Sequence, residues 1–175
     1  MKKIFYLIIP IILILIIGGI YKMSEKNTVL LKTTEGDIKI ELDKDMPITA
    51  GNFKKLTEEG FYNGVIFHRI ISNFMIQGGD PTGTGTGGPG YQIKDEFTDN
   101  NKNNKYTISM ANSGPNSGGS QFFINLVDNN FLDTKHPVFG KVIEGQDVVD
   151  KMGKAKTDAS DKPLEEIKII TAEMV

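Results

Sequence analysis

Arginine occurs once in this 175-residue chain, at Arg69, whereas lysine supplies every other permanently basic side chain. A guanidinium is a planar fork of fixed hydrogen-bond donors, which the ammonium of lysine is not. Arg69 is therefore a candidate for chemistry that requires such a fork. His68 and His136 match no zinc-ligand spacing. Cysteine does not occur in the sequence, which excludes disulfides, thiolate metal sites and a cysteine nucleophile.

Glycine-rich and serine-rich stretches suggest other chemistry, which their context does not support. Gly83–Gly88 satisfies G-x-G-x-x-G, but a dinucleotide site needs a helix directly after that turn, and Pro89 follows instead. Gly114–Ser120 lacks the lysine of a phosphate loop. The sequence contains no G-x-S-x-G nucleophile elbow. A hydrolase built from Ser113 or Ser117 with a histidine and an aspartate remains an alternative, because such triads are defined by geometry.

Two long segments carry a more specific signal. Residues 67–85 read FHRIISNFMIQGGDPTGTG, and residues 109–124 read SMANSGPNSGGSQFFI. Both closely resemble the signature sequences of the cyclophilin family. Residues 132–142, LDTKHPVFGKV, are similar to a third. The resemblance extends over about residues 28–175, and such long ordered strings are far more specific than a lone glycine motif.

Resemblance to the cyclophilins implies a mainly β fold, a closed eight-stranded antiparallel barrel capped by two α-helices, with a peptide groove on one outer face. It implies peptidyl-prolyl cis–trans isomerase activity on proline-containing polypeptides, with no cofactor, no metal and no covalent intermediate. The matching positions imply a catalytic set of Arg69, Gln77, Asn112 and His136. They also imply a substrate-binding set of Phe74, Met75, Ala111, Gln121, Phe123, Phe131 and Leu132.

The residue types suit this reaction. Resonance gives the peptide C–N bond double-bond character and a rotation barrier of ~18–20 kcal/mol. A catalyst needs an apolar pocket for the ring, and a donor such as Arg69 that stabilises the prolyl nitrogen as it pyramidalises. The expected pocket consists of Phe74, Met75, Phe123 and Leu132. Apolar side chains in a β-rich chain are by default core residues, so only the family pattern assigns these four to a pocket.

The polar residues of the implied site have complementary roles. Gln77 is expected to orient the guanidinium, and the Asn112 main chain and His136 to hold the substrate main chain. Two positions depart from the family pattern. Phe131 stands where many members carry tryptophan, and the loss of an indole donor predicts weakened cyclosporin binding. Ser113 replaces a commoner alanine, which predicts a changed preference for the residues before proline.

Hydrophobic periodicity predicts the elements that carry these residues. Strands are expected at residues 28–34, 37–43, 65–71, 74–77, 106–111, 121–126, 138–143 and 166–172. One helix is expected over residues 47–57, with Ile48, Phe53 and Leu56 on its apolar face, and a second over residues 146–152. The glycines of residues 78–90 predict an irregular loop. Many short strands with two isolated helices are typical of a barrel with helices over its ends.

An uncharged apolar run precedes this domain. Residues 4–20 follow Lys2 and Lys3, and a helix of this length spans about 25 Å, slightly less than a bilayer core of ~30 Å. We therefore expect residues 1–23 to be a helical single-pass anchor in the cell membrane, with Lys2 and Lys3 on the cytoplasmic side. Residues 24–27 then form a linker, and residues 28–175 form an isomerase domain on the extracytoplasmic side. A cleaved signal peptide that yields a secreted protein is the alternative.

The formal net charge of −2 provides no basic excess for nucleic-acid binding. The expected partners are thus proline-containing polypeptides and the membrane, and the domain is expected to be a monomer. Two functions fit: an isomerase that acts on exported or surface proteins, or a catalytically weak proline-peptide-binding module on the same fold. Arg69 and Gln77 favour the isomerase, because binding alone does not require them.

Overall fold

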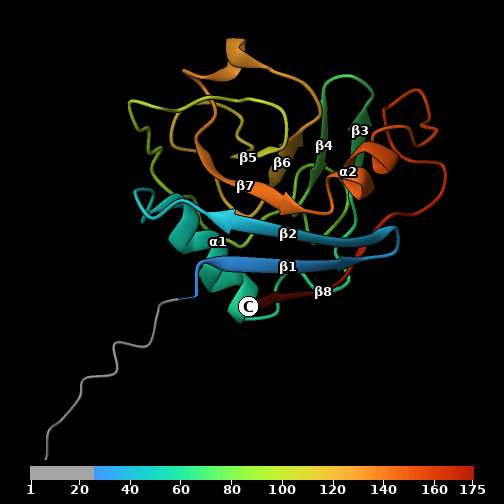
Figure 1. Ribbon diagram of the computed structural model, residues 1–175, viewed down its shortest axis with the longest axis horizontal. Coiled ribbons are helices and arrows are strands. Elements are labelled where there is room, and N and C mark those ends of the chain that lie inside the picture. The colour runs from blue at the N-terminus through green and yellow to red at the C-terminus, as the bar shows by residue number, and fades with distance from the viewer. Residues whose placement is uncertain (1–25) are drawn as a thin grey trace, which may run out of the picture.

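The computed structural model describes residues 26–175. Its strands are β1 (Thr28–Thr33), β2 (Gly36–Leu42), β3 (Arg69–Ile71), β4 (Met75–Gly78), β5 (Thr107–Met110), β6 (Phe122–Asn125), β7 (Val138–Glu144) and β8 (Ile169–Met174). Its helices are α1 (Thr49–Glu58), α2 (Gln146–Met152) and the short 3-10 helix η1 (Asn130–Leu132). The strands form one antiparallel sheet in the order β3-β4-β6-β5-β7-β2-β1-β8 (Figure 1).

The sheet curves into a half-barrel whose ladder does not close. Among the described residues β3 and β8 are its two edges, and no strand ladder joins them. The segment before β3 instead meets the segment before β8, through an isolated bridge between Ile66 and Lys168. Phe67 N–H donates to the Ile167 carbonyl across this seam, at 2.8 Å. The closed barrel expected from the sequence is thus wrong at this seam, because β3 begins only at Arg69 and the two edges meet over a short stretch.

The two helices lie where the periodicity predicts them, at opposite ends of the β1 and β2 strands (Figure 1). α1 buries Phe53 and Leu56, as expected. The expectation for Ile48 is wrong, because this residue precedes the first helical turn and 43% of it is exposed. Its N–H and that of Thr49 both donate to the Glu96 carboxylate, at 3.0 and 2.9 Å. A carboxylate so placed satisfies free N–H groups at the start of the helix.

The core fills the concave face of the sheet. Phe53 of α1 packs edge-on against Phe122 of β6, with ring centroids 5.3 Å apart. The Phe53 ring also contacts the rings of Tyr62 and Phe139, with centroids 4.9 and 5.2 Å apart. All four rings are fully buried. Because side chains alternate along a strand, this packing directs the neighbouring residues of β4 and β6 to the outer face of the sheet.

The expected N-terminal anchor helix, residues 1–23, lies outside the described residues. Within residues 26–175 neither α-helix is long and apolar enough to cross a membrane.

Candidate active site

The register of β3, β4, β6 and β5 brings the central site residues into one row. Arg69 pairs with Gln77, and Gln77 pairs with Phe123. Ser109 of β5 continues the row beside Phe123. Directly paired residues on antiparallel strands point to the same face. Arg69, Gln77 and Phe123 therefore lie together on the outer face, although 54 positions separate the first from the last.

Met75 and Phe123 provide buried apolar surface on this outer face. Only 3% and 5% of these residues are exposed. Neither belongs to the cluster of core residues on the concave face. The His136 ring covers part of Phe123 edge-on, with centroids 5.3 Å apart. Their burial is that of core residues, but they lie outside the main cluster, and their placement suits a pocket floor.

The Arg69 side chain projects from edge strand β3 and is 44% exposed. Its Nε donates to Asp161 Oδ2 at 3.2 Å. Neither terminal amino group hydrogen-bonds another of residues 26–175, so four N–H donors remain available to a ligand.

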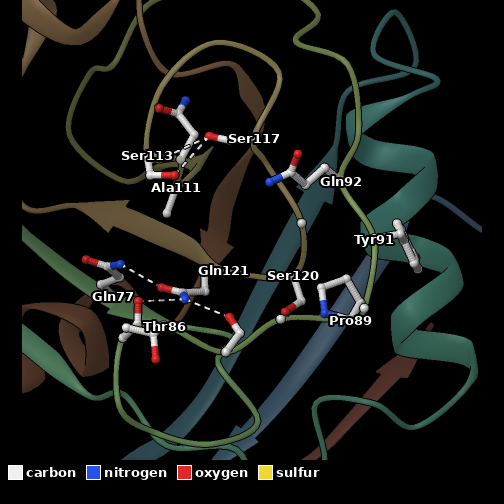
Figure 2. A pocket seen from close by; sticks show the side chains of 16 residues that line it. Gln77, Thr86, Pro89, Tyr91, Gln92, Ala111, Ser113, Ser117, Ser120 and Gln121 are labelled. Carbon is white, nitrogen blue, oxygen red and sulfur yellow. Dashed lines mark hydrogen bonds between the residues drawn. The ribbon is translucent and has the colours of Figure 1, made fainter.

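Two glutamines link the row to the glycine-rich loop. Gln77 Nε2 donates to Gln121 Oε1 at 3.0 Å. Gln121 Nε2 in turn donates to the carbonyls of Gly85 and Gly87, at 3.0 and 2.9 Å. Figure 2 shows the two amides side by side, joined by this hydrogen bond. This arrangement commits the Gln77 side-chain amino group to Gln121, and the Gln77 side-chain oxygen has no hydrogen-bond partner among residues 26–175.

The segment after β5 presents a free main chain. Ala111 N–H donates to the Gln121 carbonyl at 3.0 Å, which continues the pairing with β6 by one residue. Asn112 fixes its own side chain by donating to the Lys135 carbonyl at 2.8 Å. None of the residues 26–175 hydrogen-bonds the main-chain N–H or C=O of Asn112. Both groups are therefore available to pair with an extended peptide.

The far wall of the site comes from the segment 130–138. Phe131 of η1 is 68% exposed and stacks on Phe74, with ring planes 15° apart and centroids at 6.0 Å. Leu132 is half-buried, and its carbonyl accepts the His136 N–H at 3.0 Å. His136 Nδ1 lies 3.0 Å from the Met110 carbonyl. Because a carbonyl only accepts, Nδ1 carries the proton in this contact, and Nε2 remains free.

Asparagines that the sequence patterns did not single out hold this wall in place. Asn101 Nδ2 donates to the carbonyls of Asp133 and His136, at 2.6 and 3.2 Å. Asn103 N–H donates to the Asp133 carboxylate at 2.8 Å. Burial raises the Asp133 pKa, but the hydrogen bonds from Asn103 and Lys102 outweigh it and lower the pKa overall. No local sequence signal identifies these residues, because they act across some 30 positions of chain.

Asp80 organises the glycine-rich loop that the sequence predicted as irregular. Its carboxylate accepts the N–H groups of Thr82, Gly85 and Gly87, and the Thr82 hydroxyl. Burial raises the Asp80 pKa, but these hydrogen bonds outweigh it and lower the pKa to about 2. The end of this loop is tied to α1 through Tyr91. The Tyr91 hydroxyl donates to the side-chain oxygen Oδ1 of Asn52 at 2.7 Å.

Two grooves flank Gln77. The first, of about 770 Å³, contains the predicted Gln77, Ala111, Asn112 and Gln121 and is walled by residues 85–92 (Figure 2). The second, of about 420 Å³, contains Arg69 and Gln77 together with His68, Ser160 and Lys162. The other predicted residues line neither of these two grooves: Phe74, Met75, Phe123, Phe131, Leu132 and His136.

His68 is buried and lines the second groove. Neither of its ring nitrogens has a hydrogen-bond partner among residues 26–175. Burial lowers its pKa, so the ring is neutral at pH 7.

The hydrolase alternative finds no support in the geometry. Ser113 Oγ lies 3.3 Å from Ser117 Oγ, and Ser117 Oγ donates to the Gly114 carbonyl at 2.7 Å. In the part of the chain that the structure describes, neither hydroxyl hydrogen-bonds a histidine. The nucleophile–base contact of a triad is therefore not formed.

Comparison with known proteins decides the family. The model of the family described as "Cyclophilin type peptidyl-prolyl cis-trans isomerase/CLD" matches residues 28–174. The chain belongs to the cyclophilin family. This cyclophilin is 51% identical over 148 residues to peptidyl-prolyl cis-trans isomerase-like 1 of Rhizopus delemar, a match that covers 80% of this chain and 88% of that protein. It is 50% identical over 147 residues to a peptidyl-prolyl cis-trans isomerase of Schizosaccharomyces pombe, covering 81% and 95%.

Solved structures agree. A cyclophilin type isomerase of Cryptosporidium parvum, crystallised in the presence of the dipeptide Ala-Pro, matches with a TM-score of 0.81 and 37% identity, over 85% of this chain and 98% of that chain. This cyclophilin is therefore a peptidyl-prolyl cis–trans isomerase, and the expectation of that activity is confirmed.

Proposed function

We propose that this cyclophilin accelerates X-Pro isomerisation by non-covalent stabilisation of the twisted amide, with Arg69 as the donor. The observation that carries the proposal is the row formed by Arg69, Gln77 and Phe123 on one face of the sheet. When the proline ring of a substrate packs against Phe123 and Met75, its prolyl amide nitrogen lies next to the Arg69 guanidinium. As the amide twists, resonance is lost and the nitrogen gains a lone pair, which a preorganised N–H donor stabilises more than it stabilises either planar isomer.

The other site residues keep the substrate in register for this step. The free main chain of Asn112 pairs with the substrate residues before proline. His136 Nε2 and Leu132 form the opposite side of the substrate site. Gln77, held by Gln121, pairs with Arg69 across the strands and offers its side-chain oxygen as an acceptor for the guanidinium. No covalent intermediate and no metal is needed, because the reaction breaks and forms no bond.

The test is cis–trans exchange of an Xaa-Pro peptide, measured by NMR with the full-length chain in a mild detergent. We expect acceleration that scales with enzyme concentration, and line broadening of the peptide signals in both isomers. Peptide binding without acceleration would identify the catalytically weak binding module instead.

We further propose that residues 1–23 anchor this cyclophilin in the membrane, so that its clients are exported or surface proteins. The support is the uncharged run of residues 4–20 next to Lys2 and Lys3. We expect the full-length chain to remain with membranes after a carbonate wash, and its domain to be digested by protease added outside. Recovery of a soluble form that begins near residues 21–28 would replace the anchor with a cleaved signal.

A further inference from the structure

Asp161 contacts both Arg69 and the strand that carries it, although it lies 92 positions further along the chain. Its Oδ2 accepts from Arg69 Nε at 3.2 Å, and its carbonyl accepts from Ile70 N–H at 2.8 Å. One residue thus holds two consecutive residues of β3. We infer that Asp161 is a positioning residue that fixes the Arg69 guanidinium for the amide-twisting step. The inference rests on the role of Arg69 proposed above.

The turn that presents Asp161 is closed by its own hydrogen bonds. A bridge between Thr157 and Pro163 joins its two sides. Within it, Asp158 N–H donates to the Lys162 carbonyl at 2.8 Å, and Asp158 Oδ1 accepts the Lys162 N–H at 3.0 Å. The turn therefore holds Asp161 against β3 without help from a substrate.

The backbone of Asp161 supports the same assignment. Its φ of 64° lies in the left-handed region, which residues other than glycine seldom adopt and which asparagine and aspartate tolerate best. Such conformations persist where the surroundings impose them. Here the contacts to Arg69 and Ile70 use both the side chain and the carbonyl of this one residue.

Anchoring at Nε has a specific consequence for the guanidinium. The Arg69 side chain is 44% exposed, and an exposed arginine without a partner samples many rotamers. Because the guanidinium is planar, fixing Nε fixes the direction of the four remaining N–H groups. Misplacement of a catalytic group by about 1 Å can cost about 10²-fold in rate. The Arg69–Asp161 contact therefore matters for rate more than for stability, since exposed ion pairs stabilise little.

A matched control lies in the same connection to β8. Lys168 and Glu166 form an ion pair of 3.2 Å whose lysine is 44% exposed, the same length and cation exposure as Arg69 and Asp161. Glu166→Ala thus removes an equivalent carboxylate from an equivalent pair, away from the catalytic row. The variants for comparison are Asp161→Ala, which removes the acceptor, and Asp161→Asn, which keeps an acceptor oxygen without the charge.

The kinetic experiment compares these variants in the full-length chain. We expect Asp161→Ala to lower kcat/KM about 10-fold, mainly through kcat, because the lost interaction acts in the transition state. For Asp161→Asn, kcat/KM should fall about 3-fold or less. For Glu166→Ala, kcat/KM should equal that of the parent chain. Equal kcat for Asp161→Ala and Glu166→Ala would overturn the inference.

A spectroscopic experiment tests the hydrogen bond between Arg69 Nε–H and Asp161 directly. Because the chain contains a single arginine, only one guanidinium Nε–H signal arises in its ¹⁵N spectrum. We expect exchange of this proton with water to be about 5- to 10-fold faster in Asp161→Ala than in the parent chain or Glu166→Ala. An unchanged exchange rate would show that Asp161 does not hold Nε, and would also overturn the inference.

The variant Arg69→Lys separates this inference from the proposed function. If Arg69→Lys isomerises as fast as the parent chain, the proposed donor role fails, and with it the positioning role of Asp161. If Arg69→Lys is slow while Asp161→Ala is not, the inference about Asp161 alone is refuted. We expect both to be slow, and the double variant to be little slower than Arg69→Lys, because Asp161 acts through the guanidinium.

Discussion

Replacing Arg69 by lysine keeps a positive charge in the groove and removes the fork of donors. The structure indicates that this fork is divided between two tasks. Nε serves Asp161 at 3.2 Å, and the terminal amino groups remain for Gln77 and the substrate. A lysine ammonium on β3 carries its three donors on one atom and lacks the fixed planar spacing of the fork, so it does not reproduce the geometry of both tasks.

The magnitude follows from the step that the donor stabilises. Loss of one preorganised donor to a developing charge commonly costs ~10²–10³ in rate, or about 3–4 kcal/mol. We expect Arg69→Ala to lose this much kcat/KM, and Arg69→Lys at least about 10-fold, which is about 1.4 kcal/mol. Both residues of the Arg69–Asp161 pair are about 40% exposed, so it contributes about 0–1 kcal/mol to stability. The Tm should therefore change by less than about 4 °C.

The assay is exchange NMR on an Xaa-Pro peptide, beside a thermal unfolding curve of each variant. Lys162→Ala is the control for charge, because it removes a cation from the same groove without touching the row of paired residues. Near-full activity of Arg69→Lys with an unchanged Tm would refute the fork-donor mechanism. Arginine would then act through its charge alone, and Lys162→Ala would be expected to lower the rate as well.

Three further outcomes are expected. Phe131, which stacks exposed on Phe74, offers no donor, so Phe131→Trp should bind cyclosporin about 2- to 12-fold more tightly in a titration, as one hydrogen bond of ~0.5–1.5 kcal/mol implies. A folded-state pKa of about 2 for Asp80, against an ordinary 3.8, corresponds to about 2 kcal/mol of stability that is present above about pH 4 and is lost as the pH falls toward 2. Asp80→Asn should be less stable at pH 7 by about this amount in denaturant titrations, with a flatter acid dependence. Burial lowers the His68 pKa, so below about pH 6.5 the unfolded chain takes up the proton more readily and the unfolding free energy falls toward pH 5. A His68→Gln variant whose stability declines with pH as steeply as that of the parent chain would show that another group titrates.

Much of the fold could be predicted because it depends on local pattern. Alternation of apolar residues located the β1–β2 hairpin and the strands that carry Met75 and Phe123, each within a few residues of its observed bounds. The edge strands were less predictable. The strand expected from residue 65 begins at Arg69, because residues 64–67 bond across the seam to residues 167–169, at and just before the start of β8.

The proposed site residues were also available from the sequence, through the ordered strings that contain Arg69, Gln77, Asn112 and Gln121. Their assembly was not. Sequence alternation places Met75 and Phe123 opposite core residues on their strands, but it does not say which of the two faces is covered by α1 and which by His136. That choice depends on how the sheet folds around the helices, which is a long-range property.

Only the tertiary structure decided what holds the proposed site residues in place. Asp161 reaches Arg69 across 92 positions, and Asn101 reaches the His136 carbonyl across 35. Such contacts leave no periodicity, because each joins a single side chain to a distant segment and its energy arises only after the chain has closed the intervening loop. The sequence by itself thus determined the family, most of the strands and the choice of proposed site residues, while the packing of distant loops against β3 and η1 determined their orientation.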